Sequence, residues 1–194
     1  MNNMNKRYRI FIAINLPENI KKKLNDYQNN FREMPIKWTN TNNLHITLAF
    51  LGYIGNQEFL ELSKIIKQTV VGQAPFYISL DKIFYGPLKT MPPKMVWARF
   101  DASENFNSLR NNLNNLLLDS EIIDFSLDSK KFSPHITLGR VKKMEWRQIE
   151  PEDRQDIEQN LNLKFPVNSI EIMESKLKRN GPEYNILESV KLKG

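Results

Sequence analysis

Apolar and polar residues recur along the chain with two periods, one typical of strands and one of helices. Short β-rich segments, several ended by Pro or Gly, predict strands at residues 7–16, 44–51, 76–85, 95–100, 132–141, 167–176 and 184–191. Apolar residues at helical spacing predict helices that follow Pro17, Asn56 and Ser103, and a weaker helix at 151–161. The residues Asn180, Gly181 and Pro182 predict a turn between the last two strands.

The segment GPLKTMPPK at residues 86–94 is the best candidate boundary, because Pro and Gly interrupt regular structure there. On either side of it the order strand–helix–strand–helix–strand is repeated, with one further strand at the end. We therefore expect an α+β fold made of duplicated β-α-β-α-β units with antiparallel sheets. It would be a single two-lobed domain over residues 1–194, with approximate halves 1–86 and 94–194 related by a pseudo-twofold axis.

Both histidines of the chain, His45 and His135, lie in the same four residues, His-Ile-Thr-Leu. They are 90 residues apart, and each lies on the second predicted strand of its half. Successive side chains of a strand point to opposite faces, so each histidine shares a face with the threonine two residues later, Thr47 or Thr137. The Ile and Leu side chains anchor the other face in a core. A pseudo-twofold would bring the two His–Thr pairs together in a cleft between the lobes.

Two imidazoles can divide the work of general base and general acid near neutral pH. Two hydroxyl groups can donate hydrogen bonds to the oxygens of one tetrahedral anion. This combination suits in-line phosphoryl transfer without a metal. Singly, each histidine is more simply interpreted as structural and each threonine as a β-former; the repetition favours catalytic roles for His45, His135, Thr47 and Thr137.

The residues five positions after each histidine differ between the halves: Arg140 follows His135, and Phe50 follows His45. Gly139 permits a bulge or a close backbone approach, after which Arg140 could turn to a phosphate and bind it with two donors. Phe50 offers a flat ring on which a base could stack. The alternatives are a surface salt bridge for Arg140 and a core position for Phe50.

Composition narrows the chemistry further. With no Cys and two His, the chain cannot form a disulfide, a thiolate zinc site or a cysteine nucleophile. No metal site or cofactor is expected, and neither a signal peptide nor a membrane span is evident, which favours a cytoplasmic protein. The net charge of +6 suits a phosphate-bearing partner. Solvated charge is the default interpretation of the loop lysines that could attract RNA, namely Lys89, Lys94, Lys130 and Lys131.

With its paired His-x-Thr motifs, the chain resembles the two-histidine phosphoesterase superfamily, and within it the RNA 2′,3′-cyclic phosphodiesterases, also called 2′-5′ RNA ligases. The resemblance extends over nearly the whole chain and includes the segments RIFIAINLP, NLHITLAFLG, VWARF, FSPHITLGRV and SKLKRNGPEY. It implies a two-lobed α+β fold and metal-independent opening of a terminal 2′,3′-cyclic phosphate to a 2′-phosphate. It also implies that His45, Thr47, His135 and Thr137 are catalytic and that Arg140 contacts the phosphate.

The expected partners are RNA ends or nucleotides with a 2′,3′-cyclic phosphate, with no obligate protein partner. One alternative keeps the site but changes the reaction: 2′-5′ RNA ligation, or cleavage of another cyclic phosphate or of a 2′-5′ oligonucleotide. A less favoured alternative is a non-catalytic RNA-binding module.

Overall fold

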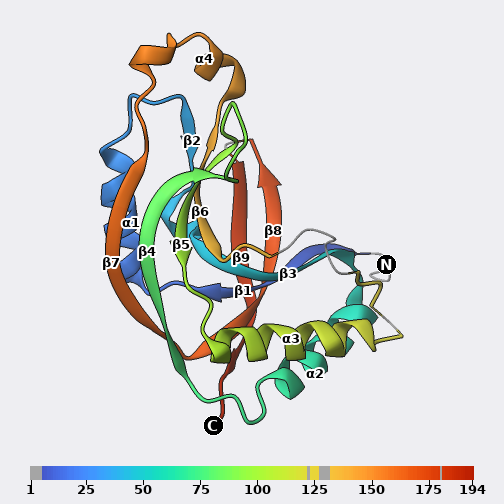
Figure 1. Cartoon of the computed structure of the whole chain (residues 1–194). Helices are drawn as coiled ribbons and strands as arrows, with labels where there is room; N and C mark the ends of the chain where they lie inside the picture. Colours follow the sequence, from blue (N-terminus) through green and yellow to red (C-terminus); the bar gives the residue numbers. More distant parts are fainter. Residues whose placement is uncertain (1–5, 122, 127–131, 180) are drawn as a thin grey trace.

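The computed structural model describes residues 6–121, 123–126, 132–179 and 181–194. Its strands form two sheets (Figure 1). The four-stranded sheet, sheet A, has the order β3 (His45–Ile54), β1 (Tyr8–Asn15), β8 (Ser169–Lys178) and β9 (Gly181–Lys191). The five-stranded sheet, sheet B, has the order β2 (Ile36–Trp38), β6 (His135–Val141), β5 (Met95–Phe100), β4 (Phe76–Gly86) and β7 (Glu158–Val167). Neighbouring strands of both sheets pair antiparallel. The predicted α+β class with antiparallel sheets is confirmed.

The sheets do not follow the halves of the chain. The strands β8 and β9, from the second half, complete sheet A, whereas β2 and β4, from the first half, belong to sheet B. Figure 1 shows this as blue and cyan strands beside red ones in sheet A. The loop at residues 86–94 joins β4 to β5, which pair with each other. It therefore connects neighbouring strands of one sheet.

The first three helices begin close to the predicted positions. They are α1 (Glu18–Asn29), α2 (Asn56–Thr69) and α3 (Glu104–Leu118). Ser103 caps α3, because its hydroxyl oxygen accepts a hydrogen bond from the backbone N–H of Phe106. In α2 the cap is Gly55 rather than the expected Asn56, and the Glu58 carboxylate accepts from the Gly55 N–H. The Glu58 carboxylate thus satisfies a backbone donor at the start of this helix.

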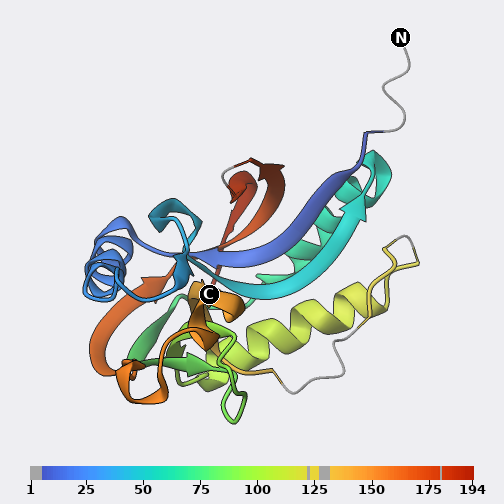
Figure 2. The ribbon, with the colours of Figure 1, turned by 90° about the horizontal axis from the view of Figure 1, so that it is seen from above.

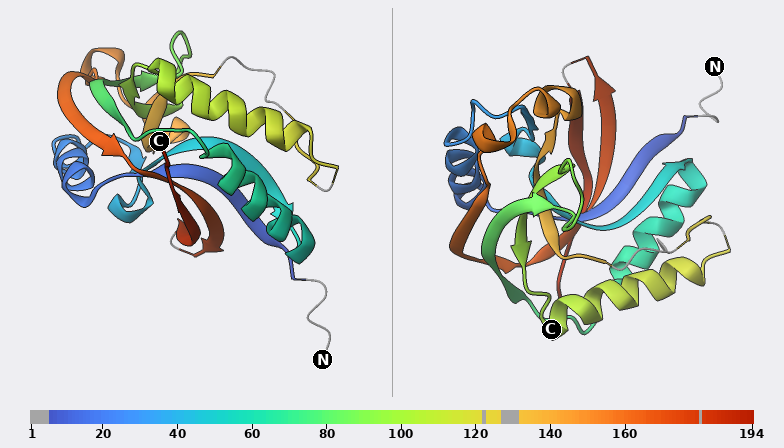
Figure 3. Two further views of the ribbon diagram at one scale, coloured as in Figure 1. Left: turned by 90° about the horizontal axis from the view of Figure 1, so that it is seen from below. Right: turned by 45° about the horizontal axis from the view of Figure 1, so that its top comes forward.

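The helices bury apolar residues against the sheets and against one another. Gln28 of α1 is buried, and its side-chain amide donates to the Leu138 carbonyl in sheet B at 2.9 Å. On α2, Lys67 forms an ion pair with Glu188 of β9 at 3.0 Å. The helices α2 and α3 lie side by side (Figure 3). Viewed from above, β1 and β3 run together along their length (Figure 2).

The prediction of a helix at residues 151–161 is wrong. This part of the chain forms a 3₁₀ turn at Pro151–Asp153 and then enters β7, while a short helix, α4 (Lys143–Arg147), precedes it. The reason is the alternation of buried residues, which has period two along β7, at Leu161, Leu163, Phe165 and Val167. β7 pairs with β4, a contact between segments far apart in the sequence. In the predicted final turn, Asn180 lies outside the described residues, as do Lys130 and Lys131 of the loop before β6.

Candidate active site

The two His-Ile-Thr-Leu segments open the strands β3 and β6. In both, the Ile and Leu side chains are buried and the His and Thr side chains are half-buried, as strand alternation predicts. β3 and β6 contact each other although they belong to different sheets. The positive charge of His135 reaches far enough to lower the pKa of His45. The fold therefore brings the two predicted catalytic histidines into one site.

Each imidazole is held by the same backbone contact. The Nδ1 of His45 lies 2.6 Å from the Asn43 carbonyl, and the Nδ1 of His135 lies 2.6 Å from the Ser133 carbonyl. A carbonyl oxygen only accepts, so Nδ1 must carry the proton in both rings. The neutral rings then present the lone pair at Nε2. For His45 this nitrogen lies 3.0 Å from the Thr47 hydroxyl oxygen, which donates to it.

Burial lowers the pKa of both imidazoles below the ordinary value of 6.5. The carbonyl contacts of Asn43 and Ser133 raise these pKa values and offset part of the effect. For His45 the charges of His135 and Lys21 lower the pKa further. Without substrate, both rings are thus neutral near pH 7 and ready to accept a proton. An anionic phosphate between them would favour the protonated form of either ring.

Aromatic side chains surround both histidines. The His45 ring contacts Phe11 and Tyr184, with centroid distances of 4.9 Å and 5.2 Å, and these two rings also contact each other at 5.0 Å. The His135 ring stacks on Trp97 at 3.9 Å with an interplanar angle of 22°. Sequence reasoning assigned no role to these three residues. A role for Trp97 could be predicted only from the pairing of β5 with β6, which places Trp97 opposite Thr137 and on the same face.

A β-bulge at the same place in both strands positions the residues five after each histidine. In the pairing of β1 with β3 the register skips Leu48, and in the pairing of β5 with β6 it skips Leu138. One extra residue reverses the alternation beyond it, so the fifth residue returns to the histidine face. Both strands accordingly show the same burial pattern over their first six residues, ending with an exposed Phe50 or Arg140.

The side chains of Phe50 and Arg140 are both exposed, but their neighbours differ. Phe50 is 70% exposed, and its ring centroid lies 6.1 Å from that of Phe11, which also contacts His45. Phe50 is thus not in the core, and most of its side chain faces solvent. Arg140 is exposed and forms no ion pair with the described residues. At Gly139 a Cβ atom would lie 2.6 Å from the Ile36 side chain, so β2 approaches β6 closely there.

Comparison with known proteins agrees with this geometry. The family described as "LigT like Phosphoesterase" matches the chain twice, at residues 14–97 and 101–184. The two matches cover most of the chain, and the chain belongs to this family. The double match also supports the duplication inferred from the two His-Ile-Thr-Leu segments.

Curated relatives resemble the chain over nearly its full length. A Thermotoga maritima protein named RNA 2′,3′-cyclic phosphodiesterase is 30% identical over 191 residues, which are 96% of each chain. A Thermus thermophilus protein with the same name is 30% identical over 190 residues, covering 96% of this chain and 91% of its own. Among solved structures, one from Thermus thermophilus superimposes with a TM-score of 0.81, at 29% identity over 96% of this chain and 98% of its own. Escherichia coli LigT in complex with 3′-AMP shares the fold, with a TM-score of 0.79, at 23% identity over 97% of this chain and 100% of its own.

None of the helices in the described part of the chain is long and apolar enough to cross a membrane. Within the same residues, no three side chains of His, Cys, Asp or Glu lie together as metal ligands would.

Proposed function

We propose that the protein is a metal-independent RNA 2′,3′-cyclic phosphodiesterase. Water adds to the phosphorus of a terminal 2′,3′-cyclic phosphate, the bond to O3′ breaks, and a 2′-phosphate with a free 3′-hydroxyl results. The observation that carries the proposal is the pair of His-x-Thr segments on contacting strands, each with Nδ1 tied to a backbone carbonyl and Nε2 left for chemistry. The names of the curated relatives support the same substrate class.

We assign the roles of the four residues as the resemblance to the two-histidine phosphoesterases implies. Nε2 of His135 accepts the proton of the attacking water, and Nε2 of His45 delivers a proton to the departing O3′. The hydroxyl groups of Thr47 and Thr137 donate to phosphate oxygens as negative charge builds on them. His45 must be protonated to act as the acid, and the bound phosphate anion supplies the charge that favours this state.

Phosphate and base are held by the two residues that the bulges place. Arg140 pairs with the phosphate through its guanidinium donors, and the ring of Phe50 stacks the terminal base beside Phe11. Complexes of Escherichia coli LigT with 3′-AMP and with phosphate support a nucleotide-sized ligand for this fold. We place the protein in the cytoplasm, since a chain without Cys is compatible with that compartment.

Product identification tests this function. Nucleoside 2′,3′-cyclic phosphates are incubated with the purified protein, with and without EDTA, and the released phosphate isomer is identified by NMR or mass spectrometry. We expect the 2′-phosphate at equal rates in both conditions. Release of the 3′-isomer, or no turnover of any cyclic phosphate, would overturn the proposal. A panel containing 2′-5′-linked dinucleotides and RNA fragments with 5′-hydroxyl ends separates phosphodiester cleavage and ligation from hydrolysis of the cyclic phosphate.

A further inference from the structure

The residue Asn43 links His45 to a distant part of the chain through two contacts. Its backbone carbonyl lies 2.6 Å from Nδ1 of His45, and its side-chain amide donates to the Pro182 carbonyl at 2.7 Å. Asn43 is only 9% exposed, so water competes little for these contacts. It ends the 3₁₀ turn at Thr41–Asn43 before β3, whereas Pro182 lies on β9. Because β3 and β9 are the two edges of sheet A, this side-chain hydrogen bond joins opposite edges of the sheet.

The start of β9 is held against His45 at two points. Within a strand the nitrogen and the carbonyl of one residue point to the same side, and a proline, which cannot donate, turns that side away from the neighbouring strand. The Pro182 carbonyl therefore needs a donor from outside the sheet, and the Asn43 amide supplies it. Two residues later, Tyr184 meets the His45 ring edge-on at a centroid distance of 5.2 Å.

The second half of the chain holds its histidine by a different device. Ser133 and Pro134 precede His135, where the first half has Asn43 and Leu44 before His45. A residue that precedes a proline is restricted to an extended backbone, so Pro134 limits where the Ser133 carbonyl can lie. Leu44 imposes no such limit. The carbonyl that holds His45 therefore depends on a tertiary contact.

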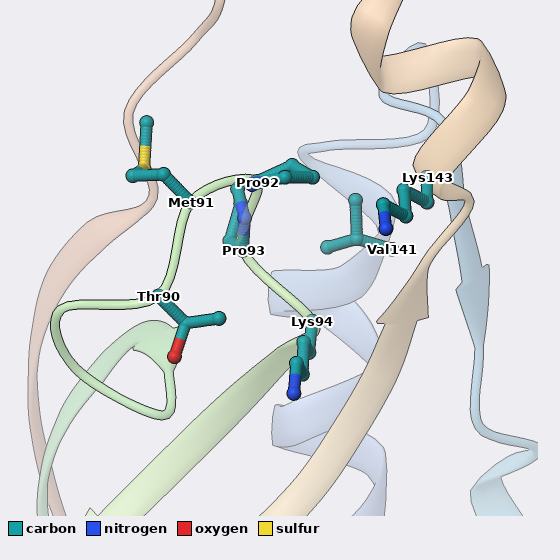
Figure 4. A pocket seen from close by; sticks show the side chains of 7 residues that line it. All are labelled: Thr90, Met91, Pro92, Pro93, Lys94, Val141 and Lys143. Atoms are coloured by element: carbon teal, nitrogen blue, oxygen red, sulfur yellow. The ribbon is translucent and has the colours of Figure 1, made fainter.

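The pocket beside the loop at residues 86–94 takes no part in this arrangement (Figure 4). Val141, which lines it, follows Arg140 on β6, so its side chain points away from the histidine face. The pocket has a volume of about 170 Å³ and is lined by Thr90, Met91, Pro92, Pro93, Lys94, Val141 and Lys143. The contacts that hold the histidines lie instead in the segments that precede β3 and β6.

We propose that Asn43 is a positioning residue, which fixes the orientation and the tautomer of His45 through its hydrogen bond to Pro182. This inference rests on the proposed function, because it concerns the imidazole that protonates O3′. While the Asn43 carbonyl retains the proton at Nδ1, the imidazolium can release a proton only from Nε2, the nitrogen beside Thr47. A carbonyl that is free to move lets the ring turn, and lets the neutral ring carry its proton on Nε2.

The tautomer of His45 is measured directly by NMR. Protein labelled with ¹⁵N-histidine shows only two imidazoles, because the chain has two histidines. Long-range ¹H–¹⁵N spectra at about pH 7.5, where both rings are neutral, distinguish a ring protonated at Nδ1 from one protonated at Nε2. The wild type should show the Nδ1–H form for both rings. Asn43→Ala should shift His45 toward the Nε2–H form and leave His135 unchanged.

Kinetics test whether this orientation serves the reaction. In Asn43→Ala, kcat toward a nucleoside 2′,3′-cyclic phosphate should fall about 10- to 100-fold, while KM stays close to that of the wild type because Arg140 is untouched. The matched control is Asn42→Ala, which changes the same residue type at an exposed position of the same 3₁₀ turn. It should leave both tautomers and the kinetics unchanged. Asn43→Asp keeps the shape of the side chain and loses only its N–H donors, so it tests the same hydrogen bond if Asn43→Ala does not fold.

The outcomes separate this inference from the proposed function. A wild-type tautomer of His45 in the folded variant, or a wild-type kcat despite a changed tautomer, would overturn the inference. So would an equal change at His135, because it would show a general loosening of the site. If the wild type hydrolyses no cyclic phosphate, the proposed function fails, whereas the NMR spectra still decide whether Asn43 orients His45.

Discussion

The residue Gly86 offers a test of how the aromatic support of His135 controls the reaction. Gly86 is buried at the end of β4, beside Trp97 of β5. A Cβ atom at this position would overlap Cδ2 and Cε3 of the Trp97 indole and lie 2.9 Å from Cε2. Carbon atoms in favourable contact are about 3.5–4.0 Å apart, so in Gly86→Ala the indole must move by roughly 1 Å. Trp97 stacks on His135 at 3.9 Å, and the imidazole must therefore move as well.

Both consequences have a magnitude. Inserting a methyl group into a packed interior typically costs about 1–3 kcal/mol of unfolding free energy. A misplacement of about 1 Å at a reacting group costs on the order of 10²-fold in rate. We expect Gly86→Ala to remain folded and to lose about 10- to 100-fold in kcat toward a nucleoside 2′,3′-cyclic phosphate.

The assay separates displacement of the histidine from general destabilisation. Unfolding in urea and steady-state kinetics are measured for Gly86→Ala, for Gly86→Ala/Trp97→Phe, and for Ile66→Val, a buried change on α2 outside the site. The smaller ring of the double variant should restore part of the lost kcat, and Ile66→Val should lose stability with kcat unchanged. Wild-type kcat in a folded Gly86→Ala variant, or no recovery in the double variant, would refute the reasoning.

Three further predictions follow from the site and the fold. His45→Ala and His135→Ala should each fold and lose about 10²–10⁴-fold in kcat, and full activity in either variant would exclude the paired mechanism. Because the pKa of both imidazoles lies below 6.5 in the folded protein, the unfolded chain binds protons first as the pH falls. The free energy of unfolding should therefore decrease as the pH falls through 6.5, and it should decrease less in His45→Asn/His135→Asn. Urea titrations at pH 7.5 and pH 5 measure this loss of unfolding free energy. An equal loss in the wild type and in the variant would contradict the prediction. Ser103→Ala should lower the unfolding free energy by about 1 kcal/mol, because the cap of α3 is lost. Its steady-state kinetics should not change, since Ser103 lies outside the site.

Much of this architecture could be predicted from local pattern. The strands β1, β4 and β5 and the helices α1 to α3 lie close to their predicted positions, because their apolar spacing is regular and Pro17 and Ser103 mark helix starts. The β7 strand was missed, since its pairing with β4 links residues far apart in the chain. The local signal at residues 151–161 therefore gave the wrong element. For the same reason, the sequence did not predict that β8 and β9 join sheet A or that β2 and β4 join sheet B.

The sequence by itself determined the chemical groups of the site and their face of each strand, because alternation along a strand is a local property. It placed His45 beside Thr47, His135 beside Thr137, and the Ile and Leu anchors on the opposite side. The tertiary structure alone decided the rest. The backbone conformation just before each strand sets the contact of Nδ1 with the carbonyl of Asn43 or Ser133. The stacking of Trp97 depends on strand pairing, and the bulge that turns Arg140 toward the histidine face depends on the register with β5. The last two features arise when distant segments exchange hydrogen bonds, and no short window of the sequence contains both partners.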